Sequence, residues 1–121
     1  MNKKIKKLWV DALRSGEYKQ GKNQLRNEKN EFCCLGVLCN IHAQLHPKIA
    51  AKNKDQQYYY GDEDVLHQKL VEWAGLDDEV GGVVKYRKKG EDIILRNWTL
   101  AELNDAGVCF HTIADLIEEQ L

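Results

Sequence analysis

The cysteines are the residues of this chain whose type and spacing could carry chemistry. Three of the four lie in one short apolar run, Phe32 to Cys39, at positions 33, 34 and 39. Thiols gathered so closely can supply a nucleophile, bind a metal, form a disulfide or pack in a hydrophobic core. The choice among these decides whether the protein is read as an enzyme.

A nucleophilic cysteine needs a lowered pKa and a base within reach. Cys34 would lie in the first turn of a helix, where the helix dipole favours a thiolate, and His111 or His42 could act as its base. A thiol buried among leucine and valine side chains instead has a raised pKa. A small cysteine-dependent enzyme with Cys34 as nucleophile is therefore the alternative hypothesis.

The ligand spacing is poorly suited to a metal. Structural zinc sites take two pairs of ligands, commonly C-x₂₋₄-C with a second pair downstream. Cys33 and Cys34 are adjacent, so on a helix they point about 100° apart, and Cys109 stands alone. We expect no metal and no cofactor. Core packing fits better, because one helical stripe would hold Cys34, Val37, Leu38, Ile41 and Leu45.

Charge is unevenly divided along the chain. Residues 1–30 carry nine basic and three acidic side chains (+6), whereas residues 91–121 carry one and seven (−6), although the net charge is −1. The two ends could neutralise each other, or the first could form a surface for anions. In the second case, cations, an aromatic ring and amides would suit a nucleotide-like ligand, and the candidate residues are Arg14, Ser15, Tyr18, Gln20, Lys22 and Arg26.

Length and composition favour one folded domain over residues 1–121, with 43% hydrophobic and 31% charged residues. No apolar run approaches the roughly 20 residues that span a bilayer, so no membrane partner is expected. The basic N-terminus lacks the apolar segment of a secretory signal. We therefore expect a cytoplasmic protein with free thiols and no disulfide framework.

The pattern of elements predicts an α+β domain of about four to five helices with short antiparallel β-hairpins. Apolar side chains at helical spacing predict a first helix over residues 5–13, ended by Gly16, and a second from about Phe32 to Gln44. Residues 48–57 are expected to form a loop, and Tyr58–Tyr60 to favour a strand.

Further elements are expected in the second half. Asp62 or Asp64 would cap a helix that contains Val65 and Leu66 and closes at Gly75. A hairpin is expected next, with strands at Val83–Arg87 and Ile93–Leu95.

The two last predicted helices follow clear signals. Thr99 and Glu102 form a capping box for a helix that ends at Gly107, and a last helix starts near Phe110. The pair has the length of a helix-turn-helix, but the last helix is acidic and phosphates would repel it. Direct DNA binding is therefore not expected, whereas homo-oligomerisation stays open.

Three blocks of the sequence carry a resemblance. They are W-x-x-A-L-R-S-G-x-Y-x-Q from Trp9, F-C-C-L-G-V-L-C from Phe32 and L-x-E-L-N-D-x-G from Leu100. Together they resemble a family of small uncharacterised proteins encoded by tailed bacteriophages and prophages. That pattern usually has serine at the position of Cys109 and an acidic residue at that of Thr112, so the last helix is expected to begin less firmly here.

The resemblance implies a phage accessory protein that acts in the host cytoplasm by binding, in host takeover or counter-defence. Two partners fit an anion-complementary surface: a nucleotide-derived signal that is sequestered, or an acidic host protein surface that is blocked. The polar positions of the first block, Arg14, Ser15, Tyr18 and Gln20, are then the expected functional surface.

Overall fold

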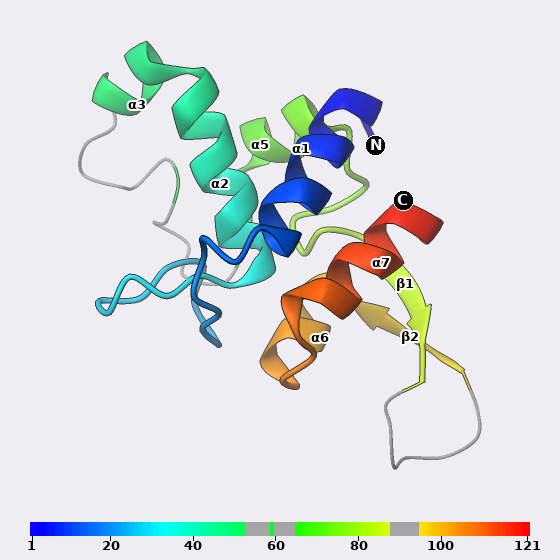
Figure 1. Cartoon of the computed structure of the whole chain (residues 1–121). Helices are drawn as coiled ribbons and strands as arrows, with labels where there is room; N and C mark the ends of the chain where they lie inside the picture. The colour runs from blue at the N-terminus through cyan, green and yellow to red at the C-terminus, as the bar shows by residue number, and fades with distance from the viewer. Residues whose placement is uncertain (53–58, 60–64, 88–94) are drawn as a thin grey trace.

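The computed structural model describes residues 1–52, 59, 65–87 and 95–121. Within them, six helices and a two-stranded antiparallel sheet form a small α+β domain (Figure 1), which confirms the expected fold class. The elements are α1 (Lys3–Arg14), α2 (Cys34–Leu45), α3 (Pro47–Lys52), α5 (Gln68–Ala74), β1 (Val83–Tyr86), β2 (Arg96–Thr99), α6 (Leu100–Asp105) and α7 (Phe110–Gln120).

Helix α1 is amphipathic and has well-defined ends. The Asn2 side-chain oxygen accepts hydrogen bonds from the backbone N–H groups of Lys4 (3.0 Å) and Ile5 (3.1 Å), so it caps the helix. The chain leaves the helix through Gly16, whose φ of +77° lies in the left-handed region. The buried face of α1 packs against both α2 and α7, so α1 lies between them.

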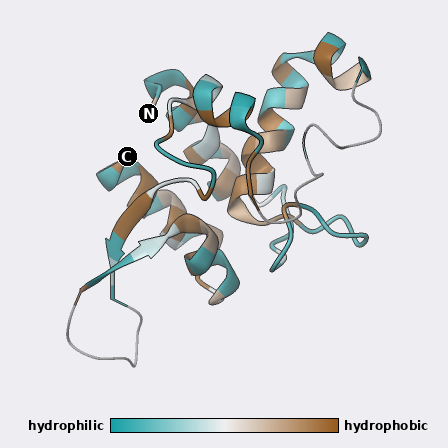
Figure 2. Cartoon of the chain, turned by 180° about the vertical axis from the view of Figure 1, so that it is seen from behind, coloured by the Kyte–Doolittle hydropathy of each residue, from teal (hydrophilic) through white to brown (hydrophobic). Residues whose placement is uncertain are grey.

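Helix α2 is the most buried element of the described chain. Its first six residues, Cys34 to Cys39, are buried, and after Asn40 the residues Ile41 and His42 are buried as well. The Cys33 sulfur caps the helix by accepting a hydrogen bond from the Gly36 N–H at 3.4 Å. Figure 2 shows hydrophobic residues gathered where the helices meet and hydrophilic residues on the outward surfaces, as amphipathic packing requires. The predicted second helix is confirmed.

The segment between α1 and α2 is an ordered loop that folds back onto α2. Phe32 forms isolated bridges with Gln20 and Arg26. Leu25 is fully buried, and its carbonyl oxygen accepts a hydrogen bond from the Cys33 N–H at 3.1 Å. A Cβ atom at Gly36 would overlap that carbonyl oxygen, so only glycine allows the loop to lie this close to the helix.

The predicted loop over residues 48–57 is wrong in its first part. Helix α3 occupies Pro47–Lys52, with proline in the first helical position, where its missing N–H needs no partner. The Ala50 N–H donates to the His46 carbonyl over 3.0 Å. The buried Tyr59 is helical, so the predicted strand is wrong at that residue. Tyr58, Tyr60, the rest of the predicted loop and the predicted caps Asp62 and Asp64 lie outside the described residues.

Two predicted boundaries also needed correction. Helix α5 starts after Val65 and Leu66, because the Leu66 N–H bonds to the Glu79 carbonyl and the cap is His67, whose Nδ1 accepts from the Lys69 N–H. Strand β2 is Arg96–Thr99 and begins after Leu95, where the predicted strand ended, since Trp98 supplies the buried side chain opposite Val84. Residues 88–94, which include Ile93 and Ile94 of the predicted strand, lie outside the described residues.

The C-terminal helices begin as expected. The Thr99 hydroxyl accepts a hydrogen bond from the Glu102 N–H at 3.1 Å, and α6 is followed by Gly107 at φ +88°. Cys109 is the cap residue of α7 but makes no side-chain capping bond in the described chain; its sulfur lies 3.4 Å from the Thr112 hydroxyl. The start of α7 thus lacks the side-chain cap that α6 has.

Candidate functional site

The cysteines of the apolar run are core residues. Cys33, Cys34 and Cys39 are buried, whereas Cys109 is exposed. The Cys34 thiol donates to the Leu100 carbonyl at 3.6 Å, and the Cys39 thiol donates to the Tyr59 carbonyl at 3.5 Å. Burial raises the pKa of both of these thiols. A buried, protonated thiol is a poor nucleophile.

The two histidines considered as bases have other surroundings. His42 is buried, with its Nδ1 2.9 Å from the Tyr59 hydroxyl and its ring stacked on His46 at 4.3 Å. Burial, with a smaller contribution from His46, lowers the pKa of His42 to about 4. His111 is exposed in the first turn of α7. In the described chain neither imidazole hydrogen-bonds to Cys34, and no group of three or more His, Cys, Asp or Glu side chains could hold a metal ion.

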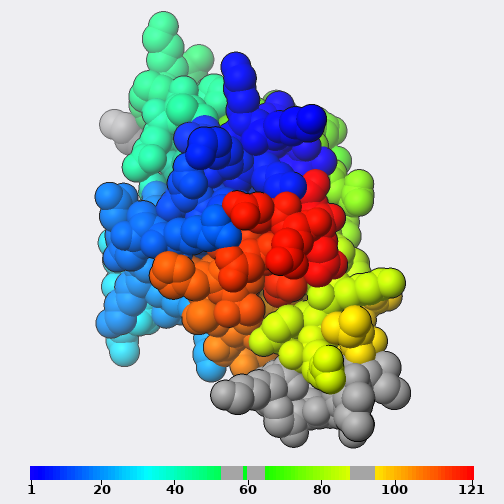
Figure 3. All heavy atoms as spheres, turned by 45° about the vertical axis from the view of Figure 1, so that its right-hand side comes forward, coloured from blue at the N-terminus to red at the C-terminus, as the bar shows by residue number. Residues whose placement is uncertain are grey.

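Arg14 links the two oppositely charged ends of the chain. Its guanidinium forms ion pairs with Asp115 at 2.5 Å and Glu118 at 2.9 Å, both on α7. Hydrogen bonds to Asp115 and then Glu118 raise the pKa of Arg14. Figure 3 shows the N-terminal residues lying directly against α7. At this point the opposite charges of the two ends neutralise each other.

The other polar residues of the first block also bond within the fold. The Tyr18 hydroxyl donates to the Asn40 side chain at 2.8 Å, and its ring packs edge-on against Phe32 at 5.1 Å. Burial is the main cause that raises the pKa of Tyr18. The Ser15 hydroxyl donates to the Ala12 carbonyl at 2.6 Å. The polar atoms of Arg14, Tyr18 and Gln20 therefore point to α7, α2 and α6 respectively.

Lys22 and Arg26 lie on the loop that follows. Lys22 is exposed and passes close to Gly107. The Arg26 Nε donates to the Asn30 side chain at 2.6 Å, and the guanidinium carbon lies 5.2 Å above the Phe32 ring. A surface pocket of about 340 Å³ is lined by Arg26, Asn27, Glu28 and Asn30. Of the six predicted ligand residues, only Arg26 lines it.

Sequence reasoning missed the central role of Asn104. This fully buried side chain accepts hydrogen bonds from Gln20 Nε2 at 3.0 Å and the Cys34 N–H at 3.1 Å, and donates to the Gly21 carbonyl at 2.8 Å. The Trp9 indole N–H donates to the Cys34 carbonyl at 2.8 Å. The three sequence blocks thus meet inside the fold. The only sign of this role in the sequence is that Asn104 is a polar residue next to a leucine in a short predicted helix.

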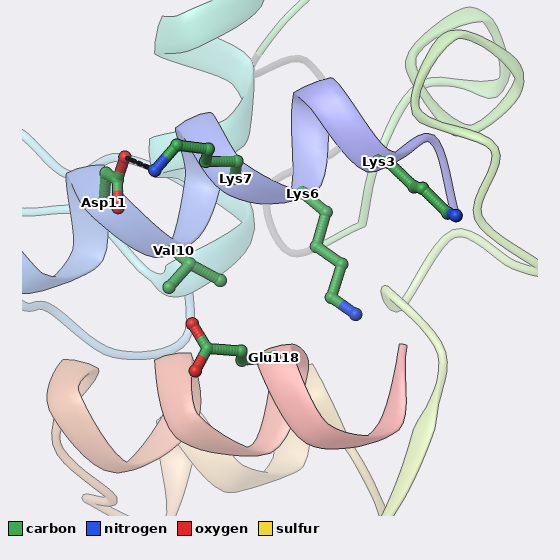
Figure 4. Close-up of a pocket in the computed structure, with 6 residues that line it drawn as sticks. All are labelled: Lys3, Lys6, Lys7, Val10, Asp11 and Glu118. Atoms are coloured by element: carbon green, nitrogen blue, oxygen red, sulfur yellow. Dashed lines mark hydrogen bonds and ion pairs between the residues drawn. The ribbon is translucent and has the colours of Figure 1, made fainter.

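A second charged surface lies at the start of α1. A pocket of about 270 Å³ between α1 and α7 is lined by Lys3, Lys6, Lys7, Val10, Asp11 and Glu118 (Figure 4). Lys7 pairs with Asp11 at 3.2 Å, and Glu118 pairs with Arg14. Across the described residues, Lys3, Lys4 and Lys6 form no ion pair. We call these three lysines the basic face.

The fold and these contacts define a small α+β protein in which Cys33, Cys34 and Cys39 are buried and the basic face lies at the surface. The chain belongs to the family described as a domain of unknown function, DUF8296, whose model matches residues 1–121. Comparison with curated proteins and with solved structures gave no match. In the described part of the chain, no helix has the length and apolar character needed to cross a membrane.

Proposed function

We propose that the protein is a phage accessory binding module that engages an acidic partner in the host cytoplasm, in host takeover or counter-defence. The basic face of α1 is its binding surface. The phage origin is supported by the three sequence blocks and by their combination in one chain. The choice of surface is supported by the position of Lys3, Lys4 and Lys6 at the start of α1.

The single observation that carries this proposal is that these cations oppose the helix dipole. The N-terminal end of a helix carries partial positive charge, which favours acidic side chains and disfavours lysines. The first turn of α1 contains no acidic residue, and the cap is the neutral Asn2. Lys7 and Asp11 form an ion pair, but both are exposed, so the pair compensates little. A bound acidic group would relieve this repulsion.

An acidic protein surface fits the basic face better than a nucleotide-derived signal does. Small-molecule sites are usually mostly apolar cavities of about 300–1,000 Å³. The pocket beside the basic face is smaller, at about 270 Å³, and among the described residues that line it Val10 alone is uncharged. Tyr18, the aromatic ring first considered for stacking on a base, packs against Phe32 instead. Lysines on a convex helix face suit the long-range steering of a charged partner.

The test compares charge-reversed variants in pull-downs from host lysate. We expect wild type to retain an acidic host protein in low salt, and K3E/K4E/K6E to lose it. A matched variant, K48E/K69E, reverses exposed lysines on α3 and α5 and should bind as wild type does. The retained protein is then purified and titrated against each variant, with binding expected to weaken as salt increases.

Two outcomes would contradict the proposal. If R14A/R26A abolished binding while K3E/K4E/K6E bound normally, the surface would be the polar block after α1 rather than the basic face. If denaturing the protein purified from infected cells released a nucleotide, and no host protein bound, the partner class would be wrong.

A further inference from the structure

One edge of the two-stranded sheet is closed by a side chain. The Gln120 amide accepts from the Lys85 N–H at 2.8 Å and donates to the Lys85 carbonyl at 2.9 Å. Gln120 therefore hydrogen-bonds to β1 much as a neighbouring strand would. Such protection prevents an edge from pairing with another chain.

The other edge, on β2, lacks this protection. In an antiparallel pair, successive residues point their backbone groups alternately toward the paired strand and away from it. The backbone N–H and carbonyl of Lys85 point outward, to Gln120. The backbone N–H and carbonyl of its register partner Asn97 therefore point outward from the opposite edge of the sheet, on β2. Asn97 is exposed, and within residues 1–52, 59, 65–87 and 95–121 no side chain or backbone group hydrogen-bonds to these outward groups.

Exposed apolar side chains flank this open edge. Val83 is 50% exposed and Leu95 is 57% exposed, and both belong to the few large hydrophobic residues left at the surface of the described chain. Val83 lies opposite Thr99, on the sheet face away from the buried Val84 and Trp98. Val83 therefore lies on the outer face of the hairpin, and strand alternation would place Leu95, two residues before Asn97, on the same face.

We propose that β2 pairs antiparallel with β2 of a second copy of this chain, about a two-fold axis at Asn97. The Asn97 N–H of each copy would donate to the Asn97 carbonyl of the other, which joins two hairpins into one four-stranded sheet. This register is self-complementary, as a two-fold interface requires.

The same register brings matching side chains together on both faces. On the outer face, Val83, Thr99 and Leu95 of the second copy form one cross-strand row, so the two exposed apolar side chains are partly covered. On the inner face, Arg96 faces Trp98 of the second copy. Within one chain, the Arg96 guanidinium lies 3.8 Å from the centre of the Trp98 ring. The contact across the axis would be a cation–π interaction of the same kind.

This pairing is independent of the proposed function. In Figure 3 the hairpin lies at the other end of the molecule from the start of α1, so both basic faces stay accessible in the dimer. A dimer would present two such faces, and a partner with two acidic surfaces would then be bound more tightly than by one copy.

The test is a site-specific cross-link. Cys109, the exposed cysteine, is first replaced by serine, and Asn97→Cys is added in that background. Directly opposed residues with paired backbone groups lie about 5.5 Å apart at Cα, within the range that a disulfide bridges. We expect thiol–disulfide exchange with oxidised glutathione to give a disulfide-linked dimer, as each oxidised glutathione is reduced to two thiols. Lys85→Cys in the same background is the matched control. Position 85 lies on the same face of the sheet as position 97 but one strand further from the two-fold axis, so this variant should form no disulfide-linked dimer.

Sedimentation of the chain without engineered cysteines gives a second readout. Wild type should show a dimer that increases with concentration, and Asn97→Pro should be monomeric, because proline removes the outward N–H. Proline is tolerated on an edge strand at such a position, so the variant should keep the wild-type melting curve at concentrations low enough for wild type to be monomeric. Equal cross-linking of the Asn97→Cys and Lys85→Cys variants, or a wild-type monomer at the highest concentration, would overturn the proposal.

Discussion

Gln20 and Asn104 lie 84 positions apart in the chain, and the Gln20 side-chain amide donates a 3.0 Å hydrogen bond to the Asn104 oxygen. The same oxygen accepts from the backbone of Cys34, so one buried amide joins the three sequence blocks. The polar residues of these blocks therefore hold the loop, α2 and α6 together.

Removing the Asn104 side chain should destabilise the fold strongly. In Asn104→Ala, the Cys34 N–H and the Gly21 carbonyl lose their buried partner, and each unpaired buried group costs about 1–3 kcal/mol. We expect the free energy of unfolding to fall by about 3 kcal/mol, measured by urea denaturation. Gln44→Ala, an exposed amide on α2, should change it by less than about 0.5 kcal/mol. Equal effects of the two substitutions would contradict the role of Asn104.

Gly36 should tolerate no side chain. Gly36→Ala drives a methyl group into the Leu25 carbonyl, so we expect a loss of more than about 3 kcal/mol or no folded protein in circular dichroism. Gly16→Ala is the matched control: no atom lies within 4 Å of the added methyl, and the left-handed backbone alone costs about 1 kcal/mol. A Gly36→Ala protein as stable as Gly16→Ala would show that the loop does not lie on α2.

Local signals made much of the fold predictable. The helical spacing of α1, the buried stripe of α2 and the Thr99 cap each depend on residues a few positions apart. The start of β2 was mispredicted because it depends on how Trp98 packs opposite Val84 across the hairpin. The strand propensity of single residues carries no information about that packing.

The candidate site was harder to predict, for a related reason. The sequence counted the cations of the N-terminal third but could not show which of them are paired. Arg14 meets its carboxylates across 101 and 104 positions, whereas Lys3 and Lys6 meet none in the described chain. Only the packing of α1 against α7 distinguishes a neutralised cation from an available one.

The thiols should differ sharply in reactivity. Cys109 is exposed, and its hydrogen bond with Thr112 lowers the pKa of its thiol, so we expect it alone to react with a thiol reagent at neutral pH. All four cysteines should react after unfolding, and the Cys109→Ser protein should not react while folded. Rapid labelling of Cys34 in the folded protein would restore the hypothesis of a cysteine-dependent enzyme.

The ion pairs of Arg14 should contribute a salt-sensitive part of the stability. Arg14→Gln removes both pairs with α7, and we expect a small decrease in melting temperature in low salt. High salt screens the exposed charges, so the difference from wild type should shrink there. Lys19→Gln, which removes the pair with Glu31 in the loop, provides a comparison that leaves the contact between α1 and α7 unchanged. A difference that persists in high salt would mean that Arg14 acts through packing.

Acid should weaken the fold through His42. Its pKa falls from an ordinary value of 6.5 to about 4 in the folded chain, so the folded state favours the neutral imidazole. Above pH 6.5 this group adds no pH dependence. As the pH falls from 6.5 to about 4, the unfolded chain takes up a proton that the folded chain resists, and stability decreases by at most about 1.4 kcal/mol per pH unit. Urea denaturation at several pH values in this range measures the slope.

In His42→Gln the slope of stability against pH should be shallower, whereas His111→Gln, at an exposed position, should keep the wild-type slope. Identical slopes for wild type and His42→Gln would show that His42 is not held neutral by its burial against His46 and Tyr59.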